Sequence, residues 1–383
     1  MGNHSNVVGG STAGRLIECP ASYKLSQGVE RRSSSFADEG SMLHAAMEVI
    51  LLEDKSREEM IGFEHEDYPG HILTDELYDE MVVPALDALD EVARLYGEYD
   101  FECEAQVKYP DIDGAFGTAD IIGGNDRYAF VLDFKFGRGV MVSAQYSPQL
   151  AFYTNAAMNT PELADFFEGD KPIIQAIIQP AFEPAIDIFE TDKNDIAEFH
   201  AALIEAWEEA QRDNPPAAVG DHCRFCPAMP TCPEQRKGVD LALPKVGQDI
   251  KVPELSDLMA LCDQLEPWIK AVRKAAHETL EAGDPVPGWK LVPKRATRRW
   301  ANESEAFKAM SAAKLTREDT LEEKVISPAK AEKLFKKKGL DFEKMSDLVI
   351  AVSSGNTLAP DSDPRPDAIA SQREGVDLAL PKQ

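Results

Sequence analysis

Three charged residues interrupt apolar segments of this sequence in a pattern that could hold a metal ion. Asp120 stands in "GTADIIGG", and Asp133 and Lys135 stand two residues apart in "FVLDFKF". Both segments have strand-like composition, and residues i and i+2 of a strand leave the same face. A charge on such a face is costly unless it has a function. Carboxylates are ligands for Mg²⁺, a bound metal activates water, and a nearby lysine adds positive charge, so the pattern indicates metal-dependent hydrolysis.

Three more polar residues could complete such a site. Gln149 and Tyr153 lie at i and i+4 in "QLAFY", on one face of a predicted helix, where they could bond to a phosphate or a base. Taken singly, a surface glutamine and a half-buried tyrosine are the more common interpretations. His44 lies on an earlier predicted helix, four residues after Gly40. A lone helix histidine is more often a satisfied polar residue than a ligand.

A second group of metal-binding residues lies in "HCRFCPAMPTC", where Cys223, Cys226 and Cys232 follow C-x2-C-x5-C spacing. In a reducing compartment, clustered cysteines more often bind metal than form disulfides. Three thiolates are one short of the four that a closed zinc site or a cubane iron–sulfur cluster uses. The spacing alone does not separate a zinc knuckle, closed by His222 or a distant ligand, from an iron–sulfur site.

The elements that must position these residues follow from hydrophobic periodicity. A period near 3.6 predicts helices, alternation predicts a strand with one buried face, and a continuous apolar run predicts a buried strand. Helices are expected within 11–27, ending near Cys19-Pro20, and over 38–54, 74–97, 147–158, 195–211 and 254–282, and strands within 99–110, 114–137 and 172–182. Cys262 lies on the apolar face of the last of these helices, so a core position is expected for it. This order of helices and strands predicts an α/β core followed by a mainly helical C-terminal region.

The order of the polar residues resembles that of a known nuclease group. Gly40-x3-His44, Gly117-x2-Asp120, Asp133-x-Lys135 and Gln149-x3-Tyr153 together resemble the RecB-type branch of the PD-(D/E)XK nuclease superfamily, over roughly residues 10–235. The whole chain is also similar to a phage and prophage protein family related to those nucleases. The resemblance implies a restriction-endonuclease-like core, with a central mixed sheet flanked by helices.

Carried over residue by residue, the resemblance implies roles for the candidate side chains. His44, Asp120 and Asp133 would bind Mg²⁺ or Mn²⁺, with help from the Phe134 carbonyl. Lys135 would be catalytic, Gln149 and Tyr153 would contact DNA, and Glu104 would be a further outer carboxylate. The sequence departs from the superfamily pattern at Ala119, which takes the place of the proline before Asp120.

The resemblance also bears on the cysteines. In iron–sulfur members of this branch, including the CRISPR-associated RecB-like exonucleases and AddB-type helicase–nucleases, one cysteine precedes the nuclease core and three follow it. Here Cys19, in "ECPAS", matches the early cysteine, and Cys223, Cys226 and Cys232 match the late three. The resemblance therefore implies a 4Fe–4S cluster, with Zn²⁺ as the alternative.

Charge is the main feature that speaks against DNA binding. The 383 residues carry a net charge of -28. Residues 246–383 hold 22 Lys and Arg against 23 Asp and Glu, so almost all of the excess negative charge lies in the first 245 residues. Such a surface repels a polyanion at long range. The segment "GWKLVPKRATRRW", residues 288–300, is the strongly basic exception, and could be either a solvated turn or a DNA-contacting patch. Its basic residues are Lys290, Lys294, Arg295, Arg298 and Arg299.

These observations predict a RecB-like nuclease domain over 1–237, a helical domain over 238–355 and a flexible tail over 356–383. The expected activity is a DNA exonuclease acting on single strands or duplex ends, encoded by a phage or prophage and serving recombination or replication. The expected partners are DNA and a phage annealing or single-strand-binding protein, with a homo-oligomer left open. A catalytically inactive nuclease fold that binds DNA or protein is the alternative. With no secretory signal or membrane span, a cytoplasmic location is expected.

Overall fold

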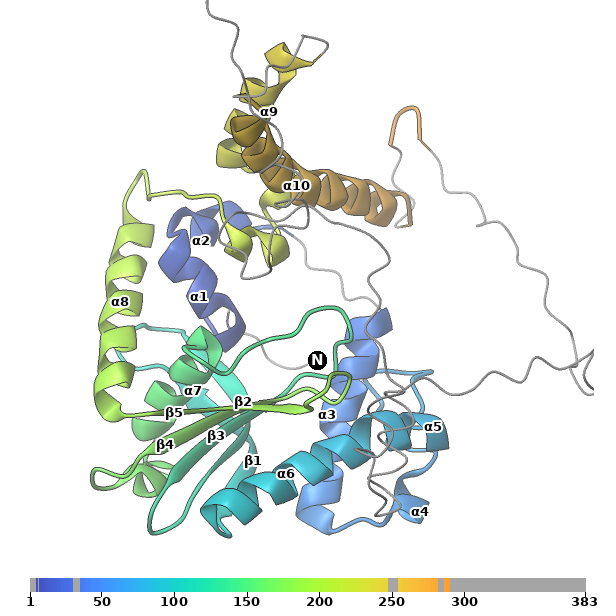
Figure 1. The fold of residues 1–383 in the computed structure, drawn as a ribbon, viewed down its shortest axis with the longest axis vertical. Helices are drawn as coiled ribbons and strands as arrows, with labels where there is room; N and C mark the ends of the chain where they lie inside the picture. Colours follow the sequence, from blue (N-terminus) through green and yellow to red (C-terminus); the bar gives the residue numbers. More distant parts are fainter. Residues whose placement is uncertain (1–4, 6, 30–34, 247–253, 282–285, 290–383) are drawn as a thin grey trace, which may run out of the picture. The chain divides into compact units, whose positions relative to one another are not determined.

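A five-stranded mixed sheet forms the centre of the fold (Figure 1). The computed structural model describes residues 5, 7–29, 35–246, 254–281 and 286–289. The strands lie in chain order: β1 (Asp100–Lys108), β2 (Phe116–Gly124), β3 (Ala129–Phe134), β4 (Ile173–Ile178) and β5 (Ile186–Thr191). β3 and β4 are parallel, and every other neighbouring pair is antiparallel.

The parallel pair requires a crossover, and helix α7 (Pro148–Met158) supplies it. The sequence starts this helix clearly. Ser147 caps it by accepting a hydrogen bond from the Leu150 N–H (3.4 Å), and Pro148 occupies its first turn. Gln149 therefore lies in the first turn, beside the end of β3.

Helices cover both faces of the sheet, and each face has its own hydrophobic core. On one face, α1 (Gly10–Glu18), α7 and α8 (Lys193–Gln211) pack against β-strand side chains such as Val131 and Ile177. On the other, α3 (Ser35–Glu53) and α6 (Val83–Tyr96) pack against Phe130 and Leu132. Figure 1 shows these two layers on either side of the strands. The predicted α/β core, with a central mixed sheet flanked by helices, is confirmed.

Shorter elements connect these layers. Helices α2 (Ala21–Ser26), α4 (Arg57–Met60) and α5 (Asp75–Leu77) are single turns or little more, and a π-helical turn (Tyr78–Val82) joins α5 to α6. Further 3₁₀ turns are Ala164–Phe167, Asp221–Phe225, Met229–Thr231 and Leu243–Lys245. The segment predicted as one helix over 74–97 is therefore three joined pieces.

The C-terminal described elements are helical. Helix α9 (Pro233–Ala242) packs against α10 (Leu255–Glu281), and the Trp268 indole N–H donates to the Pro230 carbonyl (3.4 Å). The first copy of the repeated octamer "GVDLALPK", residues 238–245, forms the end of α9 and the following 3₁₀ turn. Its second copy, residues 375–382, lies outside the described residues. No helix in the described ranges is both long and apolar enough to span a lipid bilayer.

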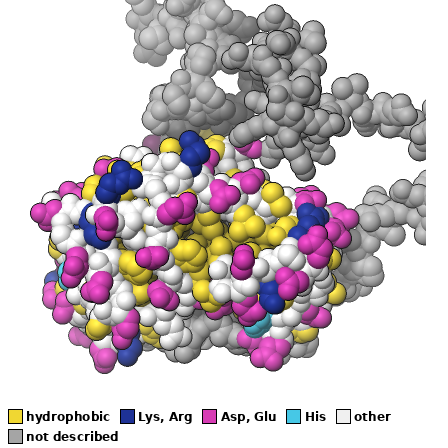
Figure 2. Space-filling model, turned by 90° about the horizontal axis from the view of Figure 1, so that it is seen from below, with side chains coloured by type: hydrophobic (Ala, Val, Ile, Leu, Met, Phe, Trp, Pro, Cys, Tyr) yellow, Lys and Arg dark blue, Asp and Glu magenta, His cyan; other side chains and the backbone are white. Residues whose placement is uncertain are grey.

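Acidic side chains dominate the surface, as the composition requires. On the face drawn in Figure 2, Asp and Glu side chains ring a hydrophobic area, and Lys and Arg are few. A polyanionic ligand would therefore need a local positive charge or a bound cation to approach this domain.

Candidate active site

Three acidic side chains form a row across the first three strands. In the β1–β2 register, the pairs on either side of Glu104 set it opposite Asp120. The last β2–β3 pair joins Ile121 to Leu132, and the next step of that register sets Asp120 opposite Asp133. Like charges opposite each other destabilise a sheet, so the row requires cationic partners.

Asp120 is the centre of the row. Its Oδ2 accepts a hydrogen bond from the Phe134 N–H (2.6 Å), and its Oδ1 lies 3.3 Å from Nδ1 of His44. The same His44 nitrogen lies 3.9 Å from Oε1 of Glu104. His44, Glu104 and Asp120 each offer one ligand atom, and these atoms lie within 4.8 Å of one another. This is the one such group of three or more among the described residues.

Asp133 is held by different partners. Only 2% of it is exposed. Gln149 donates its Nε2–H to Oδ1 (2.7 Å), and the Lys135 ammonium forms an ion pair with Oδ2. The Lys135 N–H also donates to the Ile178 carbonyl (2.8 Å), which continues the β3–β4 pairing to this residue. The predicted lysine and glutamine therefore both contact the predicted carboxylate.

The pKa values of the three carboxyls are driven apart by their surroundings. Burial raises the pKa of Asp133 to about 6, with Lys135 opposing and Asp120 adding to the rise. Burial and the charge of Asp120 raise the pKa of Glu104 to about 7. Burial also acts on Asp120, but His44, Lys135 and the Phe134 N–H outweigh it and lower its pKa. One ionised carboxylate is thus flanked by two that a bound cation would help to ionise.

His44 responds to the same charges. Burial lowers its pKa, but the charges of Asp120, Asp133 and Glu104 outweigh this and raise it. Because a metal ligand must be the neutral imidazole, a cation and a proton would compete for His44.

Glu104 adopts an unusual backbone conformation for a strand residue. Its φ is +47°, in the left-handed region that costs a non-glycine residue roughly 1–2 kcal/mol. Such strain persists where the surrounding structure imposes it, and it often accompanies functional sites.

Tyr153 is packed between two glycines. A Cβ on Gly10 of α1 would lie 2.7 Å from its ring, and a Cβ on Gly117 of β2 would lie 2.8 Å from it. Burial raises the Tyr153 pKa, and the charges of Asp133 and Asp120 raise it further. The role of Gly10 was not predicted, because nothing in the sequence indicates that α1 meets this tyrosine.

The four predicted cysteine ligands come together from two ends of the domain. Burial raises the pKa of the Cys19 thiol, and the nearby thiols of Cys223 and Cys226 raise it further. Burial likewise raises the pKa of Cys223, with Cys226 and Cys232 adding to it. All four are free thiols. We refer to this set as the cysteine site.

Hydrogen bonds that involve no sulfur atom also join the segment around Cys19 to the segment around Cys223. The Ala21 N–H donates to the Pro216 carbonyl (2.8 Å), and Arg15 Nη1 donates to the Phe225 carbonyl (3.0 Å). His222, the alternative fourth ligand, instead places Nε2 3.1 Å from the Ala218 carbonyl. The geometry therefore favours Cys19 over His222 as the partner of the three late cysteines.

Two further predictions have different outcomes. Lys290, Arg295, Arg298 and Arg299 of the basic patch lie outside the described residues. Cys262, expected in the core of the long helix, is exposed, so that expectation is wrong. Helix α10 instead turns Gln264 and Trp268 toward the preceding segment.

The donor sets fit the two kinds of metal group differently. Carboxylate oxygens and one imidazole suit Mg²⁺ or Mn²⁺, which are hard cations. Four cysteine thiols suit zinc or an iron–sulfur cluster.

Solved structures that match part of this chain include an alkaline exonuclease (LHK-Exo) from Laribacter hongkongensis. It matches with a TM-score of 0.27 and 10% identity, over 54% of this chain and 89% of that one. LHK-Exo in complex with dAMP matches with a TM-score of 0.23 and 11% identity, over 52% and 90%. The protein SSO0001 matches with a TM-score of 0.23 and 17% identity, over 57% and 95%. Similarities of this size do not establish a shared activity.

A family model matches almost the whole length of the sequence. It covers residues 4–366, which include the carboxyl row, the cysteine site and the basic patch. The chain therefore belongs to the family described as "Protein of unknown function (DUF2800)".

Proposed function

We propose that this protein is a metal-dependent deoxyribonuclease that hydrolyses phosphodiester bonds, acting as an exonuclease on single-stranded DNA or duplex ends. The observation that carries the proposal is the row of Glu104, Asp120 and Asp133 across three strands, with His44 at one side and Lys135 at the other. A purely structural row of carboxylates would be a net cost to the sheet.

The carboxylates and His44 would hold the cation. His44, Glu104 and Asp120 offer ligand atoms within 4.8 Å, and Asp133 stands on the next strand. Mg²⁺ or Mn²⁺, when bound, would supply a water of lowered pKa and positive charge at the phosphoryl oxygens. The cation would also offset the negative surface of the domain where DNA must approach.

Lys135 and Gln149 would then act around Asp133. The Lys135 ammonium contacts Oδ2, and it would offset the negative charge that develops on the phosphate during hydrolysis. Gln149 holds Oδ1 in place, so the carboxylate cannot rotate away from its neighbours. Tyr153, fixed between Gly10 and Gly117, would bound the same space and contact DNA.

We infer that the cysteine site holds a 4Fe–4S cluster, with Zn²⁺ as the alternative. The position of Cys19 before the carboxyl row and of the other three cysteines after it supports this inference, because four cysteine thiolates are the ligands of such clusters. Its role would be structural, since no side chain of the carboxyl row belongs to it. Recombination or replication of phage DNA, with an annealing or single-strand-binding partner, remains part of this proposal.

The activity can be tested with end-labelled single- and double-stranded DNA in Mg²⁺ or Mn²⁺. We expect products from at least one substrate, none without divalent cation, and none from Lys135→Ala. Linear and circular single strands compared in parallel separate an exonuclease, which spares the circle, from an endonuclease.

A catalytically inactive DNA- or protein-binding protein predicts another result. In that case neither substrate is cut under any metal condition, or a trace activity persists unchanged in Lys135→Ala and belongs to a contaminant. Either result overturns the nuclease proposal.

A further inference from the structure

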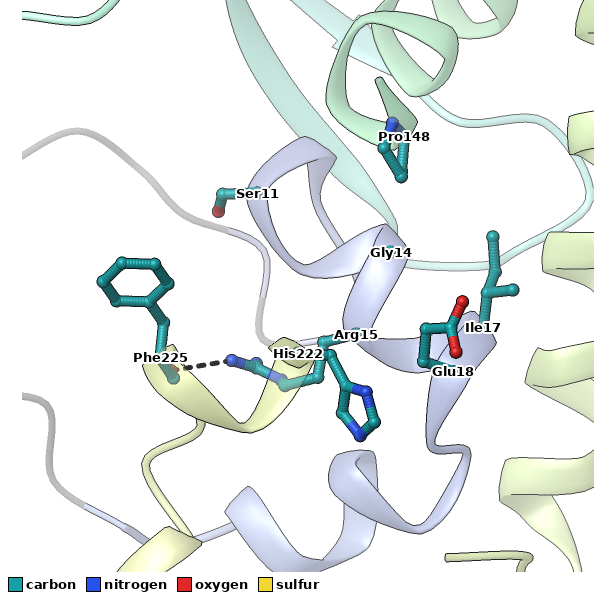
Figure 3. A pocket seen from close by; sticks show the side chains of 8 residues that line it. All are labelled: Ser11, Gly14, Arg15, Ile17, Glu18, Pro148, His222 and Phe225. Carbon is teal, nitrogen blue, oxygen red and sulfur yellow. Dashed lines mark hydrogen bonds between the residues drawn. The ribbon is translucent and has the colours of Figure 1, made fainter. Parts of the chain in front are cut away.

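A pocket separate from the carboxyl row lies between α1, the first turn of α7 and the 3₁₀ turn Asp221–Phe225 (Figure 3). Its volume is about 330 Å³, near the lower end of the range for ligand sites. Its polar and aromatic lining residues include Ser11, Arg15, Glu18, His222 and Phe225.

The pocket adjoins the proposed catalytic centre. Pro148, which lines it, precedes Gln149, and Gln149 bonds to Asp133. Helix α1 provides a second connection, because Gly10 packs against Tyr153 and Arg15 lines the pocket. Five residues of helix span about 7.5 Å. The pocket and the carboxyl row are therefore joined through α1 and the first turn of α7.

Phe225 is the unusual residue of the pocket. It is 73% exposed, although a phenylalanine contributes most to stability when it is buried. The Arg15 guanidinium bonds to its backbone carbonyl, and the Arg224 guanidinium lies 5.7 Å from its ring centroid. In Figure 3, Arg15 reaches toward Phe225, and the acidic Glu18 lies at the other end of the pocket. An exposed ring with the Arg224 guanidinium beside it, and with the Arg15 guanidinium at the backbone of the same residue, is suited to an anionic ligand with an aromatic base.

We propose that this pocket binds a nucleotide of single-stranded DNA next to the scissile phosphate, with its base stacked on Phe225 and its phosphate beside Arg15. The inference rests on the proposed nuclease activity and names its substrate form. Bases in a duplex are stacked on one another, so only an unpaired base can stack on Phe225.

The location of Phe225 adds a structural consequence. It lies between Cys223 and Cys226, so the cysteine site sets where the ring stands. The site would thereby help to position substrate without taking part in the chemistry.

The test measures binding of fluorescein-labelled 20-residue deoxythymidine oligomers to the full chain, in a Lys135→Ala background with Ca²⁺ so that no cleavage occurs. In one series of oligomers, a single abasic residue is moved stepwise along the strand. We expect one position at which the abasic residue weakens binding by about 5- to 150-fold. Phe225→Ala should bind the intact oligomer more weakly by a similar factor, and its affinity should no longer depend on where the abasic residue lies.

Matched variants separate stacking from general damage. Phe225→Tyr keeps the ring and should bind like the parent protein, whereas Phe225→Leu keeps an apolar side chain and should behave like Phe225→Ala. Metal content of each variant is measured, and an unchanged content shows that the cysteine site is intact. Binding by Phe225→Ala equal to that of the parent, or the same abasic profile in both, would overturn the proposal. If the parent cleaves DNA in Mg²⁺ despite such a result, the nuclease proposal survives and only the pocket assignment fails.

Discussion

The carboxyl row and the cysteine site differ in what holds them together. The carboxyl row stands on hydrogen-bonded strands, and three of its ligand atoms already lie within 4.8 Å. The cysteine site is built from Cys19, which follows α1, and from short turns about 200 residues later. The sheet register therefore assembles the first, whereas closing the second is the role that we propose for a bound metal. The difference predicts that metal loss affects activity at one site and folding at the other.

The largest expected effect is on activity at the carboxyl row. Asp133→Asn keeps the shape of the side chain and the acceptor for Gln149 but removes the charge. We expect the cleavage rate to fall at least about 100-fold. The thermal midpoint should not fall, because a buried charge has been removed. Rates and melting curves of the same preparations check this, and a variant within tenfold of the parent rate would contradict the assignment.

The next effect concerns stability at the cysteine site. Cys19→Ser should lower the bound iron or zinc and reduce the thermal midpoint by roughly 10 °C or more, since metal binding there contributes to folding. Elemental analysis and calorimetry measure the two quantities. Cys262→Ser is the matched control, because Cys262 is an exposed free thiol. If both variants behave alike, Cys19 is not a ligand.

A third effect concerns pH and the carboxyl row in buffer without divalent cations. Glu104 and Asp133 have raised pKa values, about 7 and about 6, so the folded state binds their protons more tightly than the unfolded state. Their stabilising contribution is complete below about pH 4 and is lost as the pH rises through 6 to 7. His44, whose pKa is also raised, changes the stability in the same direction. Asp120, whose pKa is lowered, changes the stability only as the pH falls below the ordinary pKa of an aspartate.

We therefore expect the thermal midpoint to fall between pH 5 and pH 8 without divalent cations and to recover on addition of Mn²⁺. Glu104→Gln should flatten the decline. A midpoint that rises steadily over this range would contradict the assigned pKa directions.

The smallest effect separates two glycines of the sequence pattern. A Cβ at Gly117 would lie 2.8 Å from the Tyr153 ring, whereas a Cβ at Gly40 has nothing within 4 Å. Gly117→Ala should cost about 1–3 kcal/mol and displace Tyr153, with a loss of roughly tenfold in cleavage rate. Gly40→Ala, in helix α3, should stabilise the protein by about 0.5–1 kcal/mol with unchanged rate. Equal effects of the two changes would show that Tyr153 is not held by Gly117.

Much of the fold was accessible from the sequence because its elements carry strong patterns. The polar interruptions of two apolar strands identified Asp120, Asp133 and Lys135, and the i, i+4 spacing placed Gln149 and Tyr153 on one helix. Strand β5 was not predicted, because six residues with only two isoleucines in alternation, Ile186 and Ile188, give a weak signal. The π-helical turn before α6 was also missed, since it interrupts the helical period without a proline or glycine within it.

The remaining features depend on contacts that a single sequence does not contain. The resemblance already implied Glu104 as an outer carboxylate, but its place beside His44 and Asp120 depends on the β1–β2 register and on its positive φ. The burial of Cys262 in α10 was predicted wrongly, because the contacts of this helix with Pro230 and Gln235 decide which of its residues are covered. Cys262 therefore lies on the exposed side.

The link between α1 and the cysteine turns also has a mechanical meaning. Cys19 and Cys223 lie near the two ends of the described α/β domain, and the hydrogen bonds at Arg15 and Ala21 join the same two segments. A force applied to the chain on either side would load this junction before it reached the strands between. The sheet that carries the carboxyl row would bear little of this force until the junction broke, so tension on the chain would leave the geometry of the row unchanged.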